Sequence, residues 1–306
     1  MKFVRNMNLD FFGKRKLFLL ISTVFILIGI VSMIISGFNL DADFIGGTSF
    51  TINLSRKITD GVKADIKAII KDTAGFEPSS IQLAGRDGKS VLIKTLEVDS
   101  AKRESIVAKL IDKFELGEDF TDYQVSNVGA SMTKDITRSL FLATIIAIAL
   151  MLLYIWIRFD LYTGASAIIC LFHDVFIMLT LYSIFQIPVN SNLVAAILTI
   201  LGYSINNTII VFDRIRENKK LSSTLAPAEN VNLSSNRTFA RMVNTTVTTL
   251  LTITMIYILG VTSIKNFALP LIIGLIAGFY SSSFLASPIW AMIYKEKKLK
   301  SKTIKA

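Results

Sequence analysis

The sequence predicts an α-helical membrane protein that crosses the bilayer six times and carries one small α+β domain between its first and second spans. The chain of 306 residues is 52% hydrophobic, and its mean hydropathy is +0.56. A soluble domain has about 45–50% apolar residues and rarely gathers them in long uncharged runs. Here they form six runs, each long enough to cross a hydrocarbon core of ~30 Å as a helix, and residues 38–137 form one hydrophilic insert.

The first apolar run, residues 17–37, follows a basic segment and therefore has to be distinguished from a signal peptide. It is longer than the apolar region of a signal peptide, and no small-residue cleavage site follows it, so it is interpreted as a retained span. The other five runs raise no such ambiguity. They are residues 138–158, 162–186, 189–213, 244–264 and 266–294.

Basic residues are concentrated on one side of the predicted spans. They occur in the N-terminal segment 1–16, the loop 214–243 and the tail 295–306, which the positive-inside rule places in the cytoplasm. An even number of spans then puts both termini there. The insert holds 13 basic and 16 acidic residues, as suits a translocated external domain. The net charge of +10 thus reflects topology and contact with membrane lipid, and no nucleic-acid partner is expected.

The insert has the pattern of a compact α+β domain. Helices are expected at residues 60–74 and 99–114, where apolar side chains recur on one helical face. Strands are expected at residues 43–53, 80–83, 90–96 and 120–128. The resulting order, β-α-β-β-α-β, is that of the ferredoxin-like arrangement, and the order of strands within the sheet stays open.

Several kinds of chemistry are disfavoured by the sequence. Cys170 is the single cysteine, so it cannot form a disulfide within the chain, and with one histidine no metal site is expected. No nucleotide-binding loop and no Gly-x-Ser-x-Gly sequence is present. The sequence therefore predicts neither an enzyme nor a protein with an organic cofactor.

The third span contains His173 and Asp174 near its middle. A charged carboxylate at that depth costs about 2.5–3.5 kcal/mol on insertion scales, so polar residues there are candidates for function. Two interpretations stay open. The pair forms either a buried hydrogen bond that joins helices or a titratable site that lines an ion pathway.

The fourth span carries Ser204, Asn207 and Thr208 on one helical face, with Asn206 beside them. Two adjacent amides are hard to explain as lipid-facing residues. An asparagine can hydrogen-bond between helices or coordinate a cation, but it cannot carry a proton by titration. The charged residues that end this span are most simply explained by local salt bridges.

The fifth and sixth spans contain polar and small residues at helical spacing. Arg241, Thr245 and Thr252 share one face of the fifth span. A polar path for ions and hydroxyls bonded to their own backbone explain this face equally well. Arg241 at the start of this face carries a permanently charged guanidinium, which favours a functional role for the face. Gly274 and Gly278, four residues apart, indicate close packing of helices.

Three segments resemble a known family. They are Asp43-Phe44-Ile45-Gly46-Gly47-Thr48 after the first span, His173-Asp174-Val175 in the third, and Gly202-Tyr203-Ser204-Ile205-Asn206-Asn207-Thr208 running into Asp213-Arg214-Ile215-Arg216-Glu217-Asn218. Together with the layout of one span, one small insert and five spans, they are similar to the SecF family. The resemblance extends over essentially the whole chain.

The resemblance implies one half of a transporter of the RND type in a bacterial inner membrane. SecD is the implied partner, and the SecYEG channel, YajC and a translocating preprotein are further implied partners. The SecD–SecF pair would use a proton or sodium gradient to help draw preproteins out of the channel, while the external domain holds or shields the emerging chain. The resemblance implies no cofactor, and the coupling ion would be H⁺ or Na⁺.

One position departs from the family pattern. Asn207 stands where the family typically has an aspartate, whereas Arg241 matches its intramembrane arginine. Our hypothesis is that carboxylates of SecD handle protons and that Asp174 assists. Sodium coupling, with Asn207 as an uncharged ligand, stays open.

Other classes of function compete with this one. A stand-alone ion-coupled exporter of lipids or small molecules is the main alternative, and isolation of a homo-oligomer without SecD would favour it. An intramembrane hydrolase that uses His173 and Asp174 lacks a convincing nucleophile, because Cys170 lies one turn away without evident activation. A passive scaffold within the Sec complex also agrees with Asn207.

Overall fold

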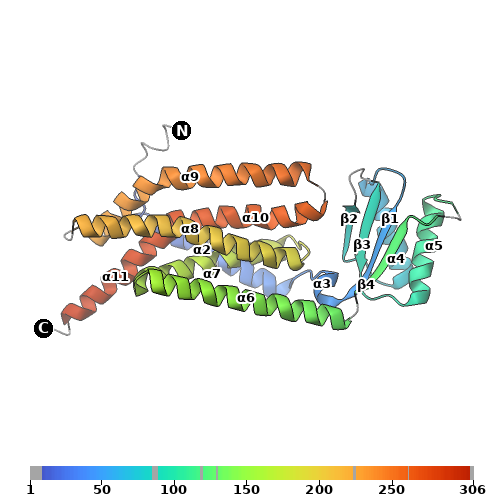
Figure 1. Cartoon of the computed structure of the whole chain (residues 1–306), viewed down its shortest axis with the longest axis horizontal. Coiled ribbons are helices and arrows are strands. Elements are labelled where there is room, and N and C mark those ends of the chain that lie inside the picture. Colours follow the sequence, from blue (N-terminus) through green and yellow to red (C-terminus); the bar gives the residue numbers. More distant parts are fainter. Residues whose placement is uncertain are drawn as a thin grey trace.

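The computed structural model describes residues 9–84, 89–117, 120–128, 130–222, 225–260 and 262–303. It consists of a long bundle of helices with a small α+β domain at one end (Figure 1). Six described helical segments are long and apolar enough to cross a membrane, which confirms the predicted number of spans. The long helices are α2 (Arg15–Ile35), α6 (Ala130–Arg158), α7 (Leu161–Ile184), α8 (Ser191–Leu221), α9 (Pro227–Leu259) and the consecutive segments α10 (Thr262–Tyr280), η1 (Ser281–Leu285) and α11 (Ala286–Thr303).

Several helices extend beyond the apolar segments that predicted them. Most of the predicted loop 214–243 is helical, because α8 continues to Leu221 and α9 begins at Pro227. With 31 residues at ~1.5 Å each, α8 is about 46 Å long and projects past a hydrocarbon core of ~30 Å. α6 likewise begins at Ala130, within the predicted insert. Hydropathy locates the part of a helix that faces lipid, whereas charged residues continue the same helix in water.

The centre of the bundle is formed by α7, α8 and the segment from α10 to α11, in which buried residues are most frequent. α2, α6 and α9 expose large apolar side chains such as Leu150, as expected of surfaces that face lipid or another subunit. The predicted packing role of Gly274 is confirmed, because a methyl group there would lie 2.5 Å from Cγ1 of Ile200 in α8.

The α+β domain has four antiparallel strands in the order β2-β3-β1-β4. Phe50 pairs with Ile93 on one side and with Val125 on the other. Two helices cover the face of the sheet that points away from the bundle (Figure 1). The predicted order β-α-β-β-α-β is confirmed. The elements are β1 (Gly47–Asn53), α4 (Asp60–Ala74), β2 (Ser80–Ala84), β3 (Ser90–Thr95), α5 (Ser100–Lys113) and β4 (Tyr123–Val128).

The segment before β1 differs from the prediction. Ala42–Ile45 forms the short helix α3 and not the start of a strand. Gly46 follows with a φ of +76°, a conformation that glycine adopts readily, and turns the chain into β1. Residues 85–88, between the strands predicted at 80–83 and 90–96, and the first eight residues of the predicted segment 1–16 lie outside the described residues.

The start of α5 depends on one capping side chain. The carboxylate of Asp99 accepts a hydrogen bond from the backbone N–H of Lys102 at 2.8 Å. Replacing Asp99 by alanine should destabilise the first turn by about 1 kcal/mol, so that its amides exchange hydrogen about fivefold faster. The variant Asp112→Ala, which changes an exposed carboxylate of the same helix, should leave that exchange unchanged. Equal acceleration by both variants would contradict the capping role.

Candidate intramembrane polar site

The carboxylate of Asp174 is the centre of a polar site inside the bundle. Its Oδ2 atom accepts hydrogen bonds from the hydroxyl of Ser204 in α8 at 2.5 Å and from that of Ser281 in η1 at 2.9 Å. Its Oδ1 atom lies 3.1 Å from Nδ1 of His173. The Asp174 side chain is fully buried. Three helical segments, α7, α8 and η1, therefore meet at one acidic group.

Among the described residues, His173 is the one basic side chain in contact with this carboxylate. Its ring stacks on that of Tyr280 with centroids 5.9 Å apart, and its Nε2 atom has no hydrogen-bond partner among the described residues. In the described part of the chain, no lysine or arginine forms an ion pair with Asp174. Within the described chain, a negative charge on Asp174 can therefore be neutralised by a proton, on Asp174 itself or on His173, or by a cation that enters the site.

The serines of the sixth span reach the site because the helix changes its winding there. Ser281–Leu285 forms a π-helical turn in which three consecutive serines are fully buried, and α11 continues at an angle to α10 (Figure 1). The Ser282 hydroxyl lies 2.9 Å from that of Thr208 in α8. Gly278 allows a close approach of α8, since a methyl group there would lie 3.2 Å from Cβ of Ser204. Turns of this kind are frequent at functional sites.

The two adjacent asparagines of α8 have opposite surroundings. Asn206 is exposed, whereas Asn207 is fully buried about one turn beyond Ser204. Neither the oxygen nor the nitrogen of the Asn207 side chain has a hydrogen-bond partner among the described residues. A buried amide left without partners costs about 1–3 kcal/mol. Asn207 therefore fits a position that contacts a water molecule or an ion.

The two residues before Ser204 take no part in the polar site. Gly202 is exposed and has open space beside it. The Tyr203 hydroxyl donates a hydrogen bond to Oγ1 of Thr246 at 3.2 Å and so joins α8 to α9. The bond between Tyr203 and Thr246 therefore supports the packing of α8 against α9.

Arg241 is not brought to this site. It is exposed on α9 and forms no ion pair with any other described residue. The Thr245 hydroxyl donates to the backbone carbonyl of Arg241 at 2.8 Å. Further hydroxyls of the same face also donate to their own helix, namely those of Thr248, Thr249 and Thr252. Bonds to the helix backbone thus explain the threonine face.

The charged residues near the end of α8 form local pairs. Arg214 donates to Glu217 at 2.6 Å, and Asp213 lies 3.6 Å from Arg158 at the end of α6. Arg216 is exposed and forms no ion pair within the described chain. These pairs agree with the local salt bridges that the sequence indicated for the charged residues of this segment.

A second group of charges joins the α+β domain to the bundle. We call it the junction, and it consists of Asp41, Asp43, Lys94 and Ser191. Nζ of Lys94, in the inner strand β3, lies 3.0 Å from Oδ2 of Asp41 and 3.2 Å from Oδ1 of Asp43. The other oxygen of Asp43 accepts hydrogen bonds from the hydroxyl and the backbone N–H of Ser191, at 2.8 and 3.2 Å. One lysine of the sheet is thereby linked to the start of α8.

The charges of the junction stabilise one another. Burial alone pushes the pKa of Asp43 up, but Lys94 and the hydrogen bonds from Ser191 outweigh burial and hold that pKa below its usual value. Burial pushes the pKa of Lys94 down, but Asp41 and Asp43 outweigh it, so this pKa is raised. The sequence pointed to Asp43, Gly46 and Gly47. It did not point to Lys94 or Ser191, because a lone lysine in a strand carries no sign of its partner.

Further hydrogen bonds hold the α+β domain and the segment that precedes it against the bundle. The side-chain amide of Asn266 in α10 donates to Oε1 of Gln82 in β2 at 2.9 Å. Between α7 and α8, Val189 donates its N–H to the carbonyl of Asn39 at 2.8 Å and accepts a bond from the N–H of Asp41 at 2.9 Å. These contacts add to the attachment of the α+β domain that the junction provides.

These features define a multi-pass membrane protein with a buried polar site and an attached α+β domain. A family model described as protein export membrane protein SecD/SecF, C-terminal, matches residues 108–296. The protein translocase subunit SecF of Petrotoga mobilis is 34% identical over 297 residues, which are 95% of this chain and 98% of that protein. The chain therefore belongs to the SecF family of protein translocase subunits, membrane transport proteins that assist protein export and are not enzymes.

Longer relatives contain SecD as well as SecF. The protein translocase subunit SecDF of Bacillus subtilis is 34% identical over 95% of this chain, which covers 39% of that protein. The crystal structure of SecDF, a translocon-associated membrane protein from Thermus thermophilus, matches with a TM-score of 0.80 at 30% identity, over 95% of this chain and 39% of that chain. The match confirms the fold class. The association in SecDF implies SecD as the partner within the Sec translocase.

Proposed function

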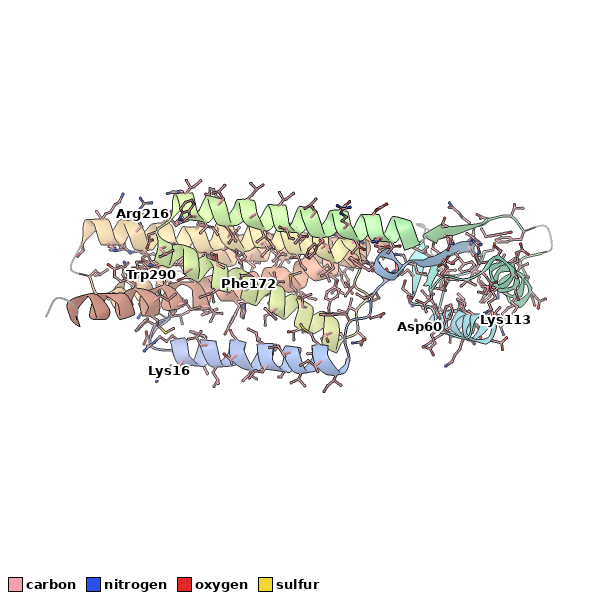
Figure 2. The ribbon with its side chains drawn as sticks, turned by 90° about the horizontal axis from the view of Figure 1, so that it is seen from below. Lys16, Asp60, Lys113, Phe172, Arg216 and Trp290 are labelled. Atoms are coloured by element: carbon pink, nitrogen blue, oxygen red, sulfur yellow. The ribbon has the colours of Figure 1, made fainter. Side chains whose placement is uncertain are left out.

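We propose that this chain acts with SecD as an ion-driven subunit that helps a preprotein leave the SecYEG channel on the outer side of a bacterial inner membrane. α2 begins and α11 ends at the end of the bundle opposite the α+β domain (Figures 1 and 2). This supports cytoplasmic termini and an external α+β domain that meets the emerging chain. The buried carboxylate of Asp174, without a lysine or arginine partner in the described chain, is the observation that carries the proposal.

The ionised and protonated forms of Asp174 need different hydrogen bonds. When ionised, its Oδ2 atom accepts bonds from Ser204 and Ser281, whereas a protonated carboxyl group has to donate one. Ser281 has another acceptor, because its hydroxyl also lies 3.3 Å from the carbonyl oxygen of Gly278. Binding of a proton would release Ser281 from α7 and alter the contact between α7 and the π-helical turn.

α8 connects this site to the α+β domain. Ser204 contacts Asp174, and Ser191 at the start of the same helix contacts Asp43 in the junction. At ~1.5 Å per residue the two serines lie about 20 Å apart along one helix. A shift of α8 caused by a change at Asp174 would therefore reach the junction. One charge that crosses the membrane supplies ~2.3 kcal/mol per 100 mV, so one or two ions suffice for a step of a few kcal/mol.

Asn207 and Arg241 indicate which steps SecD has to supply. Asn207 cannot titrate, and Arg241 is exposed on α9. We therefore expect a carboxylate of SecD to pair with Arg241 and to complete the proton relay. The unpartnered amide of Asn207 supports sodium coupling as a second candidate. Replacing sodium by potassium at a constant proton gradient should slow export only if sodium is the coupling ion.

Pulse-labelled export tests the proposed function. Cells depleted of this chain should export a secreted protein more slowly, and the wild-type chain should restore the rate only while the ion gradient is present. Collapse of the gradient should return the restored cells to the rate of the depleted cells. Unchanged export on depletion would reject the proposal and favour an exporter of lipids or small molecules.

A further inference from the structure

The end of the bundle farthest from the α+β domain contains a cavity of about 480 Å³ that the proposed coupling does not use. It lies between the ends of α6 and α8, the start of α7, and α11. Arg216 and Trp290, two of its lining residues, lie at this end of the bundle in Figure 2. Because one span ends at Arg158 and the next begins at Leu161, the cavity lies near the level of lipid headgroups.

The lining of the cavity has an excess of positive charge. Three lining residues are cationic, namely Arg158, Arg216 and Lys219. Arg158 is partly neutralised by Asp213 at 3.6 Å, whereas Arg216 and Lys219 are exposed and form no ion pair in the described chain. Asp160, the single acidic lining residue, already accepts a hydrogen bond from a hydroxyl of α7 at 2.6 Å. Two cations are therefore available to an anionic group.

Aromatic rings form one wall of the cavity. Trp290 and Tyr294 of α11 stack with centroids 5.2 Å apart, and Tyr162 meets the Tyr294 ring edge-on at 5.7 Å. Nζ of Lys219 lies 4.3 Å from the centroid of the Tyr294 ring. Tryptophan and tyrosine are typical of the membrane interface, where one part of the side chain meets hydrocarbon and the other meets headgroups or water.

The surface beside the cationic lining is apolar and uncovered. Trp156, Ile157 and Leu161 flank Arg158 in the sequence, and they are 73%, 75% and 70% exposed. A soluble anion such as phosphate gains nothing from this surface. Acyl chains would cover it and bury it from water.

We propose that this cavity binds an anionic glycerophospholipid. Its phosphate lies between Arg216 and Lys219, and its acyl chains cover the exposed apolar surface formed by Ile157 and Leu161. Basic pockets between transmembrane helices bind anionic headgroups in this way. A zwitterionic lipid binds less well, because its own cation competes with the protein for the phosphate.

Quenching of Trp290 fluorescence tests the proposal. The chain has two tryptophans, so the variant Trp156→Phe leaves Trp290 as the single reporter in the cavity wall. The full-length variant is placed in phosphatidylcholine vesicles that contain increasing fractions of phosphatidylglycerol or phosphatidylcholine with brominated acyl chains. Each cation near a membrane surface contributes about fivefold to affinity for an anionic lipid. We therefore expect brominated phosphatidylglycerol to be preferred by about tenfold or more.

Two charge variants are compared in the Trp156→Phe background. Arg216→Gln with Lys219→Gln should reduce the preference to about twofold or less, because it removes both available cations. Lys14→Gln with Lys16→Gln removes the same charge from exposed residues at the same end of the bundle (Lys16 in Figure 2) and should preserve the preference.

Three results would overturn the proposal. The first is equal quenching by the two brominated lipids in the Trp156→Phe chain. The second is an equal loss of preference in both charge variants, which would indicate a general surface potential. The third is loss of the preference on addition of inorganic phosphate, which would indicate a site for a soluble anion.

Discussion

Replacing Asp174 by asparagine is expected to remove the entire gradient-dependent part of export, so that the rate falls to that measured without a gradient. The amide has nearly the shape of the carboxylate and still accepts a hydrogen bond from Ser204 or Ser281. It cannot bind and release a proton, however, so the charge change at this position is lost. The measurement is pulse-labelled export in depleted cells that express the variant, with and without collapse of the gradient.

Two further variants separate the loss of a proton site from the loss of structure. Asp174→Glu keeps a titratable carboxyl group and should retain a measurable part of the gradient-dependent rate. Asp112→Asn makes the same chemical change on the exposed face of α5 and should leave the rate unchanged. If Asp174→Asn restored export as well as the wild type, the chain would keep its role in export and the ion coupling would belong to SecD.

The spans and the element order of the α+β domain could be predicted because both follow from local patterns. Hydropathy marks the lipid-facing part of each helix, and apolar periodicity marks the elements of the domain. The ends of α8 and α9 could not be predicted in this way, because charged residues continue both helices outside the membrane. The neighbours of Phe50 in the sheet, Ile93 and Val125, are distant in the sequence and come together only through packing.

The polar site could be predicted only in part. Asp174 and Asn207 stand out in the sequence because such side chains are costly in lipid. Ser281 does not stand out, because a serine inside a helix costs little free energy. The π-helical turn that points its hydroxyl at Asp174 also cannot be recognised from the spacing of residues. Helical spacing put Asn207 on one face with Ser204 and put Asn206 beside that face, but it did not show that Asn206 would be exposed. Consecutive residues of a helix point ~100° apart, and whether Asn206 then faces another helix or the outside of the bundle depends on how the neighbouring helices pack.

Replacing Lys94 by methionine is expected to loosen the attachment of the α+β domain to the bundle. Methionine keeps the apolar length of the side chain but removes the ammonium group that neutralises Asp41 and Asp43. Asp41 is fully buried, and removing one partner of a buried ion pair costs about 3–5 kcal/mol because the other charge stays buried. Hydrogen exchange in residues 39–47 and 187–193 should therefore accelerate about a hundredfold or more.

The attachment of the α+β domain to the bundle through the junction should also be stable over a defined pH range. The lowered pKa of Asp43 means that its contribution is complete above the usual value of 3.8 and is lost as the pH falls through the lowered value. The raised pKa of Lys94 means that its contribution is complete below the usual value of 10.5 and is lost as the pH rises further. After correction for intrinsic exchange, protection of the wild-type junction should be constant between about pH 4 and 10.

A surface ion pair of the same domain provides the matched control for Lys94→Met. Lys109 lies 2.7 Å from Asp72, and both side chains are largely exposed, so Lys109→Met should cost less than about 1 kcal/mol and leave the junction protected. Because α8 links Asp174 to the junction, Lys94→Met should also reduce gradient-dependent export although the Asp174 site is intact. Faster exchange at the junction with normal export would show that movement of the α+β domain is not driven through this contact.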